Sequence, residues 1–99
     1  MIILDIILQD EVLAAEISSF VIDKKYALQT HIDTNTIFTK NGQKKTIRLF
    51  FMTKALLYST IEKDVKQNFS SDGMIIYASP VSHIDEEFGE LLRTGIKAI

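Results

Sequence analysis

Strand-like and helix-like patterns follow one another in a set order along this 99-residue chain, and that order constrains its fold more than any single motif does. Apolar runs, or apolar residues that alternate with polar ones, predict strands, whereas apolar residues at helical spacing predict helices. The predicted strands are residues 1–9, 26–40, 44–53 and 74–81. Predicted helices begin after Asp10, Thr53 and Asp85, each of which is expected to cap the helix that follows it.

The resulting order of strand, helix, strand, strand, helix, strand, helix predicts an α+β fold. With right-handed crossovers, such a chain folds as a ferredoxin-like βαββαβ sandwich, here with a C-terminal helix. The predicted sheet order is fourth, first, third and second strand. Pro80 then ends an edge strand, where a residue without an N–H removes no central hydrogen bond. The side chains of the last helix that are expected to point inward are Phe88, Leu91 and Leu92.

The second and third strands are expected to form a projecting hairpin. Asn41-Gly42 lies between two strand-like runs and predicts a type I′ turn, which needs positive φ at both central residues. Both strands are longer than the usual ~5–6 residues, so residues 34–46 would extend beyond the sheet. Ile37 and Phe38 lie on this projection and would be exposed in a monomer, which suggests that the hairpin lies along a neighbouring subunit.

Composition limits the classes of protein to which the chain can belong. Its length predicts a single domain, residues 1–99. The net charge of −2 opposes nucleic-acid binding. The absence of cysteine excludes disulfides, thiolate catalysis and Cys-based metal sites. The N-terminal stretch has no basic start and is interrupted by Asp5, so we expect a cytoplasmic protein with no membrane insertion.

Both faces of the predicted sheet are apolar, although the two long helices can cover only one of them. The apolar side chains expected on the second face are Ile3, Ile7, Phe50, Met52, Ile75, Tyr77 and Val81. Asp5 and Arg48 interrupt this face and are expected to form an ion pair. A large exposed apolar patch indicates an interaction surface, and its burial at about 25 cal/mol per Å² would drive association. The sequence therefore predicts an obligate oligomer packed through this face.

At the level of motifs, the chain resembles CutA, the divalent-cation-tolerance proteins, which share a superfamily with the PII (GlnB-like) nitrogen regulators. The resemblance is carried by the element order, the projecting hairpin and residues 79–94, SPVSHIDEEFGELLRT. Residues 52–65, MTKALLYSTIEKDV, are similar to the family's junction between a strand and the second helix. The resemblance implies a homotrimer with its sheets inward and its helices outward.

The chain departs from the CutA pattern at the residues most often linked with metal in that family. Residues 27–31, ALQTH, lack the usual cysteine, and Ile37-Phe38 stand where a tryptophan is usual. Residues 68–73, NFSSDG, replace a His-Pro-Tyr-Glu-like stretch. The segments SDG (71–73) and RTG (93–95) are similar to nucleotide-binding segments of PII, but here a helix separates them.

His31 and Asp33 are the candidate metal ligands. They lie two residues apart on a predicted strand, so both side chains point the same way. Imidazole and carboxylate suit Zn²⁺, Ni²⁺ or Cu²⁺, and His83 of another subunit would complete a site. The alternative is that these residues form an ordinary solvated strand face. The cofactor therefore stays open, with a divalent metal ion as the candidate.

Lys44, Lys45 and Arg93 are the candidates for binding a small anionic ligand. With Lys40 and Arg48, the two lysines place four cations within nine residues around the hairpin, where they could meet a phosphate or carboxylate at a subunit cleft. Arg93 belongs to the RTG segment. The alternative is that the lysines keep the hairpin soluble and discourage strand pairing at its edge.

No catalytic residue is predicted, because no Gly-x-Ser-x-Gly, P-loop or His-Glu-x-x-His motif occurs. The acidic residues 85–87 are explained by the start of a helix. The expected function is that of a non-enzymatic, trimeric CutA/PII-like protein that binds a metal ion or small metabolite in metal tolerance or regulatory signalling. The alternative is a PII-like interaction protein whose hairpin arms regulate a partner such as a transporter or an enzyme.

Overall fold

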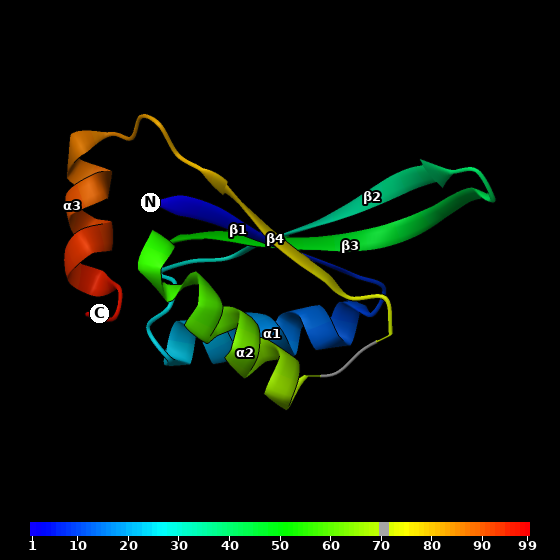
Figure 1. Cartoon of the computed structure of the whole chain (residues 1–99), viewed down its shortest axis with the longest axis horizontal. Helices are drawn as coiled ribbons and strands as arrows, with labels where there is room; N and C mark the ends of the chain where they lie inside the picture. Colours follow the sequence, from blue (N-terminus) through cyan, green and yellow to red (C-terminus); the bar gives the residue numbers. More distant parts are fainter. Residues whose placement is uncertain (70–71) are drawn as a thin grey trace.

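A four-stranded antiparallel sheet forms the centre of the molecule (Figure 1), as seen in a computed structural model that describes residues 1–69 and 72–99. The strands are β1 (Ile2–Leu8), β2 (His31–Thr39), β3 (Gly42–Thr53) and β4 (Ile75–Pro80). The helices are α1 (Glu11–Asp23), α2 (Tyr58–Asn68) and α3 (Glu86–Gly95), and a 3₁₀ turn, η1 (Ala55–Leu57), precedes α2. The observed sheet order, β2-β3-β1-β4, confirms the prediction and leaves Pro80 on an edge strand.

The core lies between the sheet and the two helices α1 and α2, which cover the same face (Figure 1). Alternate residues of β1 and β3 point into it, so that each strand buries every second side chain. The main core side chains are Leu4, Ile6, Leu8, Leu49 and Phe51 from the sheet, and Ala14, Ile17, Val21, Ile61 and Val65 from the helices. No helix among the described residues is both long and apolar enough to cross a membrane.

The chain between α1 and β2 is a loop, so β2 begins five residues later than predicted. Lys25 adopts a positive φ of 62° and ends the helix, and the backbone N–H of Tyr26 then donates to the Val21 carbonyl oxygen (2.9 Å). Tyr26 and Ala27 are buried in this loop, whereas Leu28 is 38 % exposed, so the alternation of apolar and polar residues here does not mark a strand. The prediction that Thr53 caps a helix is wrong. Thr53 ends β3, and its hydroxyl donates to the Tyr26 carbonyl oxygen (2.7 Å).

The β2–β3 hairpin projects from the sheet as predicted, but its turn is not the predicted one. Thr39 pairs with Gly42, so Lys40 and Asn41 are the central residues of the turn. Asn41 has no positive φ, whereas Gly42 has a φ of 115°. The type I′ turn centred on Asn41-Gly42 is therefore wrong. The Asn41 N–H instead donates to the Thr39 hydroxyl (3.2 Å), which stabilises the turn locally.

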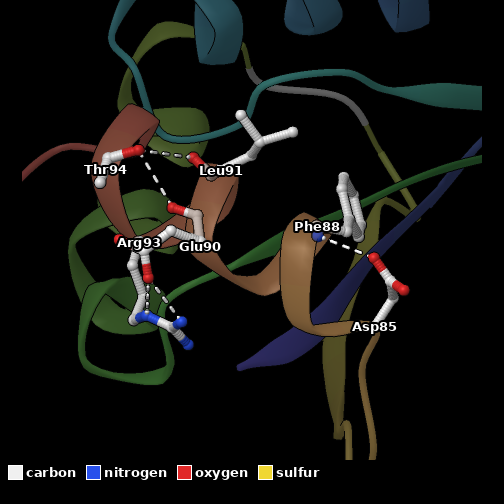
Figure 2. Close-up of polar contacts among 6 residues, drawn as sticks. All are labelled: Asp85, Phe88, Glu90, Leu91, Arg93 and Thr94. Carbon is white, nitrogen blue, oxygen red and sulfur yellow. Dashed lines mark hydrogen bonds and ion pairs between the residues drawn. The ribbon is translucent and has the colours of Figure 1, made fainter.

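Helix α3 stands at one end of the sheet and is capped as predicted (Figures 1 and 2). The Phe88 N–H donates to the Asp85 side chain (2.9 Å), and Asp10 caps α1 in the same way. The packed side chains of this segment are Phe88, Leu92 and Ile96, which recur every four residues. Leu91 is 59 % exposed, so its predicted inward position is wrong, because it lies off this stripe.

The two neighbouring leucines of α3 provide a matched pair of variants. Leu92 is 1 % exposed, and Leu92→Ala should lower the free energy of unfolding by about 2–5 kcal/mol, since it leaves a cavity in the core. Leu91→Ala makes the same chemical change on an exposed surface and should change it by about 0.5 kcal/mol or less. Urea unfolding at equal chain concentration measures both. Equal losses would contradict the orientation of α3.

Tyr26 anchors the loop after α1 and has a strongly perturbed ionisation. Its hydroxyl donates to the carboxylate of Asp64 on α2. Burial first, and then the hydrogen bond to Asp64 and the negative charge of Asp64, together raise the pKa of Tyr26 to about 12. Between pH 10 and 12 the native state therefore keeps a proton that the unfolded chain loses, so stability falls as the pH rises through this range.

The Tyr26 ionisation can be followed by ultraviolet absorbance of tyrosinate. We expect one tyrosine of the folded chain to titrate near pH 12 and to disappear from the titration in Tyr26→Phe. Asp64→Asn should move this pKa only part of the way back, because burial is the larger cause. A titration in which every tyrosine of the folded protein ionises near pH 10 would contradict this account.

Candidate functional site

The second face of the sheet, which we call the open face, confirms the expected apolar character. The strand register places its side chains together: Ile3, Asp5 and Ile7 from β1, Arg48, Phe50 and Met52 from β3, and Ile75 and Tyr77 from β4. Ile75 is 56 % exposed and Tyr77 is 46 % exposed. Neither α1 nor α2 covers this face, so the single chain leaves these apolar side chains half-buried or exposed around the Asp5–Arg48 pair.

Asp5 and Arg48 form the predicted ion pair at the middle of the open face. Arg48 Nε donates to Asp5 Oδ1 at 2.6 Å, and the Asp5 side chain is only 4 % exposed. The Arg48 guanidinium carbon lies 4.0 Å from the centre of the Phe50 ring, and Arg48 Nη1 lies 3.9 Å from Asp33 Oδ2. One guanidinium thus neutralises a buried carboxylate that would otherwise be costly to remove from water.

A small apolar cavity lies where α3 meets the open face, and we call it the α3 cavity. Its volume is about 100 Å³. Its lining residues are Ile3, Leu28, Gln29, His31, Phe50, Phe51, Met52, Phe88 and Leu92. The His31 imidazole stacks on the Phe50 ring, with centroids 4.9 Å apart and planes at 16°. This cavity leaves no signal in the sequence, because its walls come from four separate segments.

The candidate metal ligands are only partly brought together. His31 pairs with Phe50 and Asp33 pairs with Arg48, so the two side chains share a face, as predicted, and that face is the open face. His83 lies in the loop before α3, where Ser82 Oγ is 3.1 Å from its Nδ1. In residues 1–69 and 72–99, no three His, Asp or Glu side chains gather as a metal centre. The described part of one chain therefore supplies His31 and Asp33 alone at this position, and completion by another subunit's His83 stays a prediction.

The candidate cations for an anionic ligand also lie apart in one chain. Lys44 and Lys45 are adjacent on β3 and point to opposite faces of the hairpin. Arg93 lies on α3, where its Nη2 is 2.7 Å from Glu90 Oε2 (Figure 2). Figure 1 places the hairpin tip and α3 at opposite ends of the molecule. A ligand shared by Lys44, Lys45 and Arg93 would therefore need a second copy, so this site too stays a prediction.

The residues of the RTG segment, 93–95, form the last turn of α3 and make contacts within the chain. Besides the Arg93–Glu90 pair, the Thr94 hydroxyl donates to the Glu90 carbonyl oxygen (3.0 Å; Figure 2). A Cβ on Gly95 would lie 2.6 Å from Leu28 Cδ2, so glycine lets α3 approach the loop before β2. In the SDG segment, Ser71 lies outside the described residues, and Gly73 has a φ of 78° in a turn. These contacts explain the RTG residues without a nucleotide.

The buried ion pair predicts a specific loss of stability. Arg48→Ala leaves the Asp5 carboxylate buried without its partner, and we expect the free energy of unfolding to fall by about 3 kcal/mol. Arg93→Ala removes an exposed pair and serves as the control, with an expected loss of less than about 1 kcal/mol. Chemical denaturation at one fixed chain concentration compares them. A loss from Arg48→Ala no larger than the control's would show that the pair does not stabilise the fold.

The comparisons with known proteins point to one fold. No protein-family model matches this sequence, and no curated protein sequence matches it. In structure, CutA1 from Pyrococcus horikoshii superposes with a TM-score of 0.88 at 17 % identity, over 99 % of this chain and 100 % of that chain. The divalent cation tolerance protein CutA1 of Thermus thermophilus gives 0.79 at 17 % identity, over 98 % and 100 %.

A third solved structure extends the likeness. The periplasmic divalent cation tolerance protein CutA of Archaeoglobus fulgidus gives a TM-score of 0.81 at 17 % identity, over 98 % of this chain and 100 % of that chain. The chain therefore has the CutA1 fold, as its motifs indicated, and that fold is ferredoxin-like. None of these three proteins is named as an enzyme.

Proposed function

We propose that this chain, which has the CutA1 fold, is a non-enzymatic homotrimer that binds a divalent metal ion between its subunits, in a metal-tolerance or metal-sensing role in the cytoplasm. The observation that carries the proposal is the open face. It combines exposed apolar side chains such as Ile75 and Tyr77 with an ion pair that is already neutralised. When copies of the chain cover such a surface, burial of its apolar area is favourable, and the desolvation cost of its charges is small because they are already paired.

The ligand site follows from the position of His31 and Asp33. Both lie over the open face at the edge strand β2, where a neighbouring copy would approach. Each chain supplies one imidazole and one carboxylate, which is an incomplete set for Zn²⁺ or Cu²⁺. A further ligand such as His83 of the next subunit would complete it. The names of the Thermus and Archaeoglobus proteins, which refer to divalent cation tolerance, support a metal ion as the ligand class.

A thermal-shift and calorimetric titration tests this proposal. We expect Zn²⁺ or Cu²⁺ to raise the melting temperature, because a ligand at 100 times its Kd stabilises the native state by about 2.7 kcal/mol. His31→Ala and Asp33→Asn should abolish most of this shift, whereas Asp72→Asn, in an exposed turn, should preserve it. ATP, ADP and AMP form a second arm that tests the anionic-ligand site of Lys44, Lys45 and Arg93. Metal binding that persists unchanged in His31→Ala would contradict the proposed site.

The second candidate function is that of an interaction protein, and the exposed hairpin favours it. Phe38 is 80 % exposed near the hairpin tip, as expected for a surface that meets another molecule. In this case no metal or nucleotide would shift the melting temperature, and the hairpin would bind a different protein such as a transporter or an enzyme. Titration of the trimer with such a partner, with Phe38→Ala as the control variant, distinguishes this function from metal binding.

A further inference from the structure

We propose that Asn41 is a site of spontaneous deamidation, at which water converts the side-chain amide to a carboxylate and the hairpin tip, residues 39–45, gains a negative charge. Water is the sole co-reactant, so the proposal goes beyond the proposed function and does not rest on it. Three properties of the tip support it: the residue that follows Asn41, the exposure of the turn, and the positive charges around it.

The reaction takes place across the peptide bond between Asn41 and Gly42. The Gly42 nitrogen attacks the side-chain carbonyl carbon of Asn41, and a new C–N bond closes a succinimide ring. The side-chain nitrogen leaves as ammonia and carries away the proton of the Gly42 amide. Water then opens the ring at either of its carbonyl carbons and leaves aspartate or isoaspartate. One amide and one water thus become one carboxylic acid and one ammonia, with no transfer of electrons.

The residue after each asparagine separates Asn41 from the other two asparagines of the chain. Ring closure brings the next backbone nitrogen against the side chain, and a side chain on that next residue hinders the approach. Gly42 has no Cβ, and no described atom lies within 4 Å of the position that a Cβ would take. Asn35 and Asn68 instead precede a threonine and a phenylalanine. The Asn68 amide also donates to the Asp64 carbonyl oxygen (2.8 Å), which holds that side chain in place.

The turn is exposed and is held by contacts within the hairpin. Asn41 and Gly42 are both exposed. In the part of the chain that the structure describes, residues 35–39 and 42–46 pair with each other alone, because the pairing of β3 with β1 ends at Ile47. The Thr39 hydroxyl accepts from the Asn41 N–H (3.2 Å) and donates to the Gly42 carbonyl oxygen (3.2 Å). Exposed local bonds of this kind open easily, which lets the backbone reach the geometry of ring closure.

The charge around Asn41 favours the same reaction. Lys40 and Lys44 line one shallow hollow together with Asn41. With Lys45, the tip contains three lysines and no acidic residue. Negative charge develops on the Asn41 side-chain oxygen as the Gly42 nitrogen attacks, and a carboxylate remains at the end. The positive potential of the lysines therefore stabilises both the transition state and the product.

The products change the surface of the tip in two ways. Both of them place a carboxylate among the lysines, so the formal charge of residues 39–45 falls from that of three lysines to that of three lysines less one carboxylate. Isoaspartate also carries the main chain through the extra side-chain carbon, which changes the turn that the Thr39 hydroxyl stabilises. An interaction that uses the hairpin tip would therefore change as the protein ages.

Mass spectrometry of the purified, folded chain during incubation at mildly alkaline pH tests the proposal. We expect a species in which –OH has replaced –NH₂, located at residue 41 by peptide mapping and present as both aspartate and isoaspartate. Asn41→Gln should abolish this species, because glutamine would have to close a larger ring. Asn35→Gln, a matched change on the same hairpin, should leave its rate of formation unaltered. An Asn41 amide that persists, or modification that occurs instead at residue 35 or 68, would overturn the proposal.

A parallel incubation in guanidinium chloride tests the part played by the folded turn. We expect the folded chain to deamidate at residue 41 no more than about tenfold more slowly than the unfolded chain, because the turn opens at little cost. A folded chain whose Asn41 stays intact while the unfolded chain reacts overturns the proposal. The metal titrations give a separate result: deamidation without a metal-induced thermal shift contradicts the proposed metal binding alone, and a metal-induced shift with an intact Asn41 contradicts the deamidation alone.

Discussion

Each central strand of the sheet carries apolar side chains on both of its faces, while α1 and α2 cover only one. This imbalance governs the rest of the structure. On the covered face, Leu4, Ile6 and Phe51 build an ordinary core. On the open face, the same strands present Ile3, Phe50 and Met52 to solvent or to another chain. Because apolar surface favours burial in proportion to its area, the open face supports the proposed association of several chains.

The Asp5–Arg48 pair shows how the open face can carry charge and still be buried. Asp5 is almost fully enclosed within the single chain, and Arg48 covers it while stacking on Phe50. The carboxylate is thus already removed from water before any second copy arrives, so association adds only a modest desolvation cost. The nearby Asp33 gives Arg48 a second carboxylate, and His31 stacks on the same phenyl ring. The candidate ligands are therefore held in place by the surface that is proposed to assemble.

The sequence predicted the features that depend on local chemistry or on alternation along a strand. Asp10 and Asp85 cap their helices as expected, and the Asp5–Arg48 pair follows from the strand register. Errors arose where tertiary contacts override a local pattern. Thr53 has a typical capping side chain, but its hydroxyl instead donates to the carbonyl oxygen of Tyr26, a buried residue in the loop after α1. The helical stripe of α3 admits Leu92 but not Leu91, and only the position of the helix decides between them.

The candidate site was predictable in part for the same reason. That His31 and Asp33 share a face follows from a spacing of two residues, whereas the α3 cavity joins residues from four segments that no spacing rule connects. The separation of Arg93 on α3 from Lys44 and Lys45 on the hairpin depends on where α3 stands at the end of the sheet. The sequence predicted that the hairpin projects, because both of its strands are long. It did not predict the turn, which depends on which residue takes positive φ.

Sedimentation equilibrium of the purified chain over a range of micromolar concentrations tests the central claim most directly. If the open face must be covered by copies of the same chain, the mass should correspond to three chains at every concentration, with native circular dichroism. A single, well-folded chain throughout that range would show that the open face tolerates water, and would contradict the claim that burial of this face drives association.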